Sequence, residues 1–236
     1  MNSEAKSKNT KKKKNYGNFL YDFIKLTGII PLSIWLRPKL IYMGKKPKLK
    51  GGYMVFANHC SFMDPLLIHC IFYNRRIHTL ATKDLYSNDL RTFMFDTMLC
   101  IQVDKANFSV DSFHEVVKLL KRGKVVCIFP EGRVSPGSDN ILAFKSGMAL
   151  MAYTAGVPIV PMYLLPTKKW YNRRVAVMGQ PIDIKEMCGK RPSTADLDNV
   201  SKYLHEKELE LQRYYHENFD KAKKDTEIKI TEKEEV

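Results

Sequence analysis

The chain has 236 residues, of which 44% are hydrophobic and 27% charged, so a chain that is disordered throughout is excluded and one domain with a sizeable core is expected. Its net charge of +14 lies near the N-terminus: residues 6–50 hold thirteen Lys or Arg and one acidic residue, whereas residues 51–236 hold twenty-six basic and twenty-three acidic residues. The five cysteines form no C-x-x-C pair, which indicates reduced thiols on the cytoplasmic side and neither disulfides nor a zinc site.

The N-terminal fifth of the chain divides into two parts. Residues 1–15 are rich in lysine and nearly free of apolar side chains, so we expect a disordered basic tail. Residues 16–50 are aromatic and aliphatic, but their longest uncharged stretch, residues 26–36, is about half of the roughly 20 residues that a spanning helix needs. We therefore predict an amphipathic, membrane-associating segment that lies in a membrane surface. A helix packed on the domain and a true single span are the alternatives.

From residue 51 the pattern alternates between short apolar runs and helical segments, which is typical of an α/β domain. Strands are expected at 53–57, 77–81, 100–103, 125–129, 158–164 and 175–178. Helices are expected at 65–73, 85–98, 109–121 and 144–155. We predict a single α/β domain over residues 51–190, with a mostly parallel or mixed central sheet flanked by helices. A charged helix at about 195–221 and a polar tail should form residues 191–236.

Two of the predicted strands end in polar residues, and ligands of open α/β sheets bind beyond the carboxyl ends of strands. The strand "YMVFA" leads into Asn58 and His59, and Asp64 follows five residues after His59. A turn between them would let the carboxylate orient the imidazole, which makes a general base near neutral pH. Asp64 also precedes Pro65, as a helix N-cap would, so capping is its alternative role.

The second strand, "VVCIF", leads into "PEGR". Gly132 would let the backbone approach a ligand closely, and Arg133 offers a planar fork suited to phosphate. A surface turn with an ion pair is the alternative interpretation of this stretch. The sequence contains no G-x-S-x-G elbow, P-loop or dinucleotide fingerprint, and one His with one Asp does not indicate a metal site.

In this order, the two stretches resemble the motifs of the glycerolipid acyltransferases, most closely those of the lysophosphatidate (1-acylglycerol-3-phosphate) O-acyltransferases. His59 and Asp64 match the H-x-x-x-x-D motif, and "FPEGR" at 129–133 matches the second hallmark block. "QVDK" at 102–105 and "VPIVPM" at 157–162 also fit. The resemblance covers about residues 50–180, so the predicted domain would be the catalytic one.

The resemblance implies that His59 deprotonates the acceptor hydroxyl and that Asp64 orients His59. It implies substrate binding by Glu131, Gly132, Arg133 and Lys105. The sequence departs from the family pattern twice: Arg133 directly follows Gly132, and Lys105 stands where the family usually has arginine. The implied reaction moves a fatty acyl group from acyl carrier protein (ACP) or CoA to the sn-2 hydroxyl of lysophosphatidate. The product is phosphatidate, and no cofactor besides the acyl donor is implied.

The expected partners are an anionic membrane surface, lysophosphatidate and the donor thioester. The enzyme would sit on the cytoplasmic face of the membrane, peripheral or monotopic. Glycerol 3-phosphate, another lysophospholipid or an acylated amine are alternative acceptors. A basic nucleic-acid-binding protein is the alternative of another class. However, the positive charge flanks an apolar segment and does not form a groove with interleaved aromatics, so no nucleic-acid partner is expected.

Overall fold

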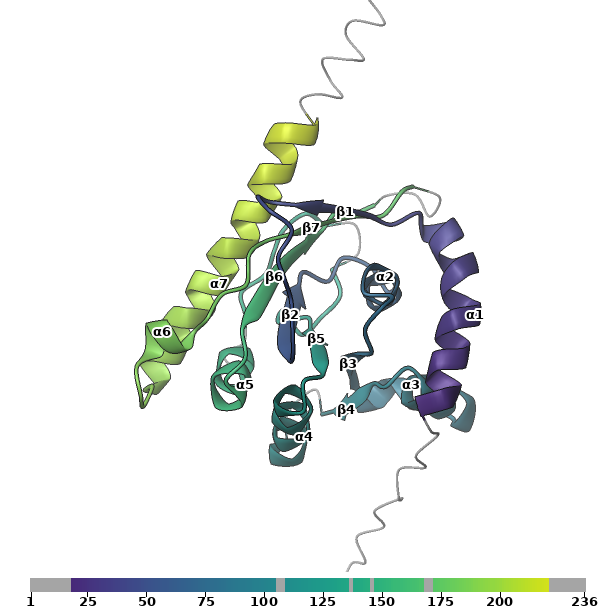
Figure 1. The fold of residues 1–236 in the computed structure, drawn as a ribbon, viewed down its shortest axis with the longest axis horizontal. Helices are drawn as coiled ribbons and strands as arrows, with labels where there is room; N and C mark the ends of the chain where they lie inside the picture. Colours follow the sequence, from purple (N-terminus) through teal and green to yellow (C-terminus); the bar gives the residue numbers. More distant parts are fainter. Residues whose placement is uncertain (1–17, 105–108, 136–137, 145–146, 168–171, 221–236) are drawn as a thin grey trace, which may run out of the picture.

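A mixed sheet of seven strands in the order β1-β7-β6-β2-β5-β3-β4 runs through the middle of the structure (Figure 1). The computed structural model describes residues 18–104, 109–135, 138–144, 147–167 and 172–220. The strands are β1 Lys39–Tyr42, β2 Tyr53–Ala57, β3 Ile77–Thr82, β4 Ile101–Val103, β5 Val125–Ile128, β6 Ile159–Leu164 and β7 Val175–Met178. β6, β2, β5, β3 and β4 are parallel, whereas β7 and β1 run in the opposite direction. The predicted α/β fold with a mixed central sheet is confirmed.

Helices cover both faces of the sheet (Figure 1). α1 and α2 lie on one side, and α4, α5 and α7 lie on the other. The helices are α1 Asn18–Leu36, α2 Asp64–Ile71, η1 Lys83–Leu85, α3 Asp89–Thr97, α4 Val110–Lys121, α5 Gly147–Ala155, α6 Lys185–Cys188, α7 Thr194–Tyr215 and η2 His216–Asp220. The sheet is therefore the middle layer of three.

β2 is the central strand, and all five of its residues are buried. Because side chains alternate along a strand, Tyr53 and Val55 pack toward α2, whereas Met54 and Phe56 pack toward α4, α5 and α7. A parallel strand that is buried on both faces needs an uninterrupted apolar run, and "YMVFA" supplies it. β2 is thus held in the core up to the residue at which the polar motif begins.

The structure differs from the predicted elements mainly at the edges. β1, which was not predicted, pairs with β7 although it lies within residues 16–50. Lys39 is exposed and the other three residues are only partly buried, so their hydrophobic pattern is weak. The predicted helix at 85–98 is wrong in its first turn: α3 begins at Asp89, because Asn88 caps it by accepting the Arg91 N–H at 2.9 Å. The tails at 1–15 and 221–236 lie outside the described residues, and the prediction of their disorder stays a prediction.

α1 packs on α2 and also exposes an apolar face. Tyr21 and Leu36 are buried at its two ends. Between them, Leu26, Ile30 and Ile34 are 60–71% exposed. Among the helices in the described ranges, none is long and apolar enough to cross a membrane.

The contact between α1 and α2 buries a histidine. His69 of α2 is 5% exposed, and its Nδ1 lies 3.4 Å from the Tyr21 hydroxyl. Its Nε2 has no hydrogen-bond partner within the described residues. Burial lowers the pKa of His69 to about 4, because the charged ring would lose its hydration.

This burial predicts acid-sensitive stability. With a folded pKa of about 4 and an ordinary value near 6.5, the unfolded chain takes up the proton first as the pH falls. The contribution of neutral His69 to the free energy of unfolding is complete above about pH 6.5 and is lost toward pH 4. Between about pH 7 and pH 5, His69 should therefore lower the free energy of unfolding by about 2 kcal/mol. Urea unfolding should show that His69→Leu removes this difference. The exposed His114 on α4 supplies the control, because His114→Leu should leave it unchanged.

Candidate active site

The two polar motifs meet because their strands are neighbours. β2 and β5 are parallel and paired in register, with Phe56 opposite Ile128, so their carboxyl ends lie side by side. The His59 ring stacks on Phe129, with 4.2 Å between ring centroids and 17° between planes. The His59 backbone N–H donates to Glu131 Oε1 at 3.2 Å. The structure therefore brings His59 and the turn at Glu131 into one site at the carboxyl ends of β2 and β5.

His59 and Asp64 form a hydrogen-bonded pair, with 2.9 Å between Nδ1 and Oδ2. The His59 side chain is 15% exposed and the Asp64 side chain 4%. Because a carboxylate can only accept, it holds the proton on Nδ1 and leaves Nε2 as the ring nitrogen that can take up a proton. A turn between the two residues creates the contact, as the spacing predicted.

The alternative role of Asp64 as a helix cap is not what the structure shows. The N-cap position of α2 is Met63, and Asp64 is the first residue of the helix. Its Oδ2 accepts the backbone N–H groups of Cys60 at 2.8 Å and Ser61 at 2.7 Å. The carboxylate thus closes the turn before the helix, because these two N–H groups point inward where the chain reverses. Three donors converge on one oxygen and fix it against His59.

The predicted substrate-binding residues fall into three situations. Glu131 is 7% exposed and accepts a hydrogen bond from the His59 N–H, so in this structure it positions the backbone of the base. Burial raises the pKa of Glu131, and hydrogen bonds from the backbone N–H groups of His59 and Leu142 oppose that rise. Arg133 follows the carboxyl end of β5 and is exposed. Lys105 lies outside the described residues, and its role stays a prediction.

Gly132 turns the chain between Glu131 and Arg133. Its φ of 68° lies in the left-handed region, where a Cβ would be strained. Its N–H donates to Phe129 O at 3.1 Å and closes the turn directly after β5. A glycine is therefore required for Glu131 to point back at β2 while Arg133 points outward. Ligand contact by Gly132 stays a prediction.

Asn58 contributes more than the sequence indicated. It is 3% exposed, and its side chain joins the end of β2 to β6: Nδ2 donates to Leu164 O at 2.9 Å, and Oδ1 accepts the Leu164 N–H at 2.6 Å. This amide continues the sheet pairing past the last residue of β2. An asparagine directly after a fully apolar strand was the available signal, and its partner on β6 could not be read from it.

Cys60 lies beside His59 and Asp64 but is unsuited to nucleophilic attack. It is 4% exposed, and its Sγ lies 3.9 Å from Asp64 Oδ1. Burial, and then the charge of Asp64, raise the pKa of the thiol, so the reactive thiolate is disfavoured. Within the described residues, no group of three or more His, Cys, Asp or Glu side chains could hold a metal ion. His59 is therefore the candidate catalytic group of the site, as a general base.

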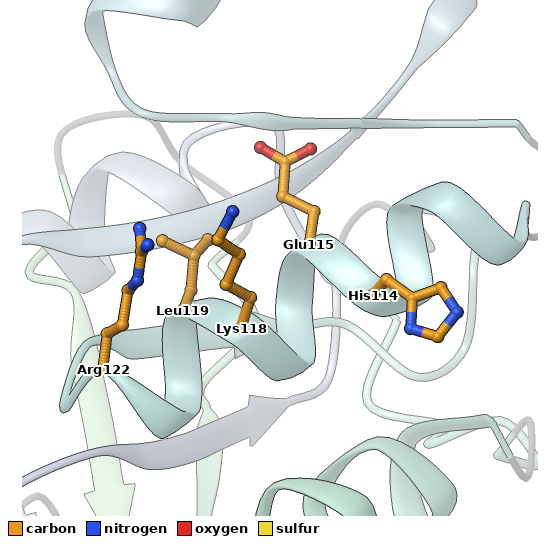
Figure 2. Close-up of a pocket in the computed structure, with 5 residues that line it drawn as sticks. All are labelled: His114, Glu115, Lys118, Leu119 and Arg122. Atoms are coloured by element: carbon orange, nitrogen blue, oxygen red, sulfur yellow. The ribbon is translucent and has the colours of Figure 1, made fainter.

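A separate surface hollow lies along α4 (Figure 2). Its five lining side chains all project from α4 or its C-cap: His114, Glu115, Lys118, Leu119 and Arg122. None of them belongs to the His59 site. Because α4 leads into the amino end of β5, the last turn of α4 lies at the amino ends of the strands, whereas His59 lies at their carboxyl ends.

Comparison with known proteins shows the family of the chain. The sequence model described as Acyltransferase matches residues 39–165, just over half of the chain. The chain therefore belongs to the Acyltransferase family. The match includes the His59–Asp64 pair and the Glu131 turn, and it ends with β6.

Individual relatives are distant. The 1-acyl-sn-glycerol-3-phosphate acyltransferase of Borreliella burgdorferi is 29% identical over 158 residues, 65% of this chain and 62% of that protein. The protein of the same name from Streptococcus pneumoniae is 27% identical over 87% of this chain and 77% of its own length. The chain thus spans less than two thirds of the Borreliella burgdorferi protein.

A solved structure shares the fold. The crystal structure of the 1-acyl-sn-glycerophosphate (LPA) acyltransferase PlsC from Thermotoga maritima superposes with a TM-score of 0.57. The superposition covers 84% of this chain and 77% of that one, at 21% sequence identity. At this identity the comparison supports the fold.

The geometry separates two tasks of Asp64, closing the turn and orienting His59. In Asp64→Asn an amide oxygen in the place of Oδ2 can still accept all three donors, but it carries no charge and cannot stabilise the imidazolium that forms when His59 takes up a proton. We expect turnover to fall roughly 100- to 10,000-fold with little change in melting temperature. Asp111, an exposed acid in the first turn of α4, supplies the control variant Asp111→Asn. Native turnover in Asp64→Asn would limit Asp64 to closing the turn.

Proposed function

We propose that the chain transfers a fatty acyl group from a thioester, acyl-ACP or acyl-CoA, to the sn-2 hydroxyl of lysophosphatidate, giving phosphatidate. The observation that carries this proposal is the 2.9 Å contact between His59 Nδ1 and Asp64 Oδ2, which leaves Nε2 as the ring nitrogen that can act on a hydroxyl. A thioester is already activated, so a base and a positioned hydroxyl suffice.

The reaction follows from the groups at the site. His59 Nε2 takes the proton of the acceptor hydroxyl while the hydroxyl oxygen attacks the thioester carbonyl carbon. The new ester bond forms, the carbon–sulfur bond breaks, and the leaving thiolate takes the proton from His59 Nε2, which restores the neutral base. Asp64 stabilises the imidazolium that forms in between. Arg133 would bind the acceptor phosphate with its planar fork.

The surroundings of the site suit an acceptor that resides in a membrane. Phe62 lies in the turn between His59 and Asp64 and is 75% exposed. The apolar face of α1, formed by Leu26, Ile30 and Ile34, is also exposed, and lysines precede and follow this helix in the sequence. We propose that α1 lies in the surface of an anionic membrane on the cytoplasmic face and holds the enzyme there as a peripheral protein.

An acceptor screen tests the proposed reaction. The purified chain is incubated with acyl-CoA or acyl-ACP and with lysophosphatidate, glycerol 3-phosphate, a neutral lysophospholipid or an acylated amine, and products are read by mass. We expect phosphatidate from lysophosphatidate, and a roughly 100- to 10,000-fold loss in His59→Ala without unfolding. A product from another acceptor alone, or native turnover in folded His59→Ala, would contradict the proposal.

The role of Arg133 predicts unequal effects on the two substrates. Arg133→Lys keeps the positive charge but loses the two parallel hydrogen bonds of the guanidinium. The KM for lysophosphatidate should rise about tenfold, the loss of roughly one charge-assisted hydrogen bond, while the KM for the donor stays near its native value. Arg122→Lys, at the C-cap of α4, is the control. Equal changes for both substrates would give Arg133 a structural role.

If α1 lies in a membrane surface, its exposed apolar side chains should strengthen membrane binding in addition to the attraction of the lysines. Replacing Leu26, Ile30 and Ile34 by Gln keeps every lysine but removes apolar burial in the headgroup region, so binding to anionic vesicles should weaken roughly tenfold or more. Native protein should stay bound in about 1 M salt, where charge attraction is screened. Sedimentation with vesicles measures both.

Met187 and Tyr203 on the opposite side of the sheet supply the control for this experiment, since both are partly exposed and should not contact the membrane. Unchanged sedimentation of the α1 triple variant, or release of native protein by salt, would show that charge alone or another surface attaches the chain.

A further inference from the structure

α7 has a glutamate, Glu208, on the face that packs into the core. The buried residues of α7 gather on one face of the helix and are Leu197, Val200, Ser201, Leu204, Glu208, Leu211 and Tyr215. Five of the seven are apolar or aromatic, and the Ser201 hydroxyl donates to Leu197 O at 2.9 Å within the helix. Glu208 is 0% exposed in the middle of this face. Its place in the sequence pattern is that of a leucine.

The contacts of Glu208 point to the active site. One carboxyl oxygen, Oε1, accepts the backbone N–H of Asn58, the residue that precedes the base. The other, Oε2, has no hydrogen-bond partner within the described residues. Burial raises the pKa of Glu208 well above its usual value. A buried and half-satisfied carboxyl group destabilises a core, so packing does not account for it.

Glu208 and Glu131 hold consecutive groups of the same segment. Glu208 accepts the N–H of Asn58, and Glu131 accepts the N–H of His59 at 3.2 Å. One carboxyl group comes from α7 and the other from the turn after β5. The backbone that leads into the base is therefore fixed from two elements.

The side of α7 around Glu208 also contacts the loop that follows Arg133. His205 Nε2 lies 3.3 Å from Ile141 O, and Gln212 Nε2 donates to Asp139 O. His216, just after α7, pairs with Asp139 at 2.9 Å between Nε2 and Oδ2. These residues lie three to four positions from Glu208 or from each other, so one side of the helix reaches both active-site segments.

We propose that α7 is part of the active site, with Glu208 as a positioning residue that sets the backbone of Asn58 and His59, while the polar side chains beside it hold the loop after β5. The inference rests on the proposed acyl transfer at His59. α7 lies beyond the family match, which ends at residue 165. A displacement of about 1 Å in a catalytic group can cost on the order of 100-fold in rate.

A set of variants tests this role. Glu208→Leu fits the apolar stripe but leaves the Asn58 N–H without its acceptor; we expect kcat to fall roughly 10- to 100-fold while both KM values change little and the melting temperature does not fall. Glu208→Gln restores an acceptor and should recover most of the lost activity. Leu204→Ala, one turn earlier, weakens α7 packing and should lower the melting temperature with native kcat.

Hydrogen exchange of the full chain gives a readout that does not need the reaction. In Glu208→Leu, exchange should quicken in the peptide covering residues 55–64 and stay native in β6 and β7. Should Glu208→Leu not fold, Gln212→Ala at a half-exposed site serves instead, with faster exchange over residues 138–144 and a lower kcat.

The outcomes separate this inference from the proposed function. Native kcat and native exchange in the α7 variants would overturn the positioning role. A kcat that falls in parallel with melting temperature in both Glu208→Leu and Leu204→Ala would overturn it as well, since that pattern is structural. Faster exchange over residues 55–64 in a protein that does not acylate lysophosphatidate would support the positioning role and end the proposed reaction.

Discussion

The hydrogen bond between His59 Nδ1 and Asp64 Oδ2 is the interaction on which the proposed chemistry depends. A histidine at a strand end is useful as a base only when one tautomer and one ring orientation are fixed. Asp64 fixes both because its own oxygen is held by the Cys60 and Ser61 N–H groups. The stacking of the ring on Phe129 removes the remaining rotation. An activated thioester needs little beyond such a base and a well-placed acceptor.

The fold supplies the rigidity that this pair requires. β2 is buried on both faces and lies between two parallel strands, so its carboxyl end is placed by the core of the domain. The Asn58 side chain extends that pairing to β6, and the carboxyl groups of Glu131 and Glu208 take the next two N–H groups. Three side chains beside His59 are thus used to hold backbone, which leaves Nε2 as the atom that we propose acts on the acceptor.

Sequence reasoning found what depends on local pattern and missed what depends on tertiary contact. The apolar run of β2, the turn between His59 and Asp64 and the block at Glu131 are continuous in sequence, and all three were predicted. β1 is short and half-buried, and Asn88 capped α3 later than the periodicity indicated. Glu208 lies 150 residues from its partner Asn58. The visible signal was a single glutamate in an apolar stripe, and nothing local says which backbone it meets.

NMR can identify which ring nitrogen of His59 carries the proton. The chain holds six histidines, and in ¹⁵N-histidine-labelled protein the His59 resonances are assigned as those lost in His59→Gln. In the neutral ring we expect a proton on Nδ1 that is shifted downfield by Asp64, and an unprotonated Nε2; the downfield shift should shrink in Asp64→Asn, which lacks the carboxylate charge. A His59 ring with its proton on Nε2 in the native protein would contradict the account, because that nitrogen could not take the proton of an acceptor hydroxyl.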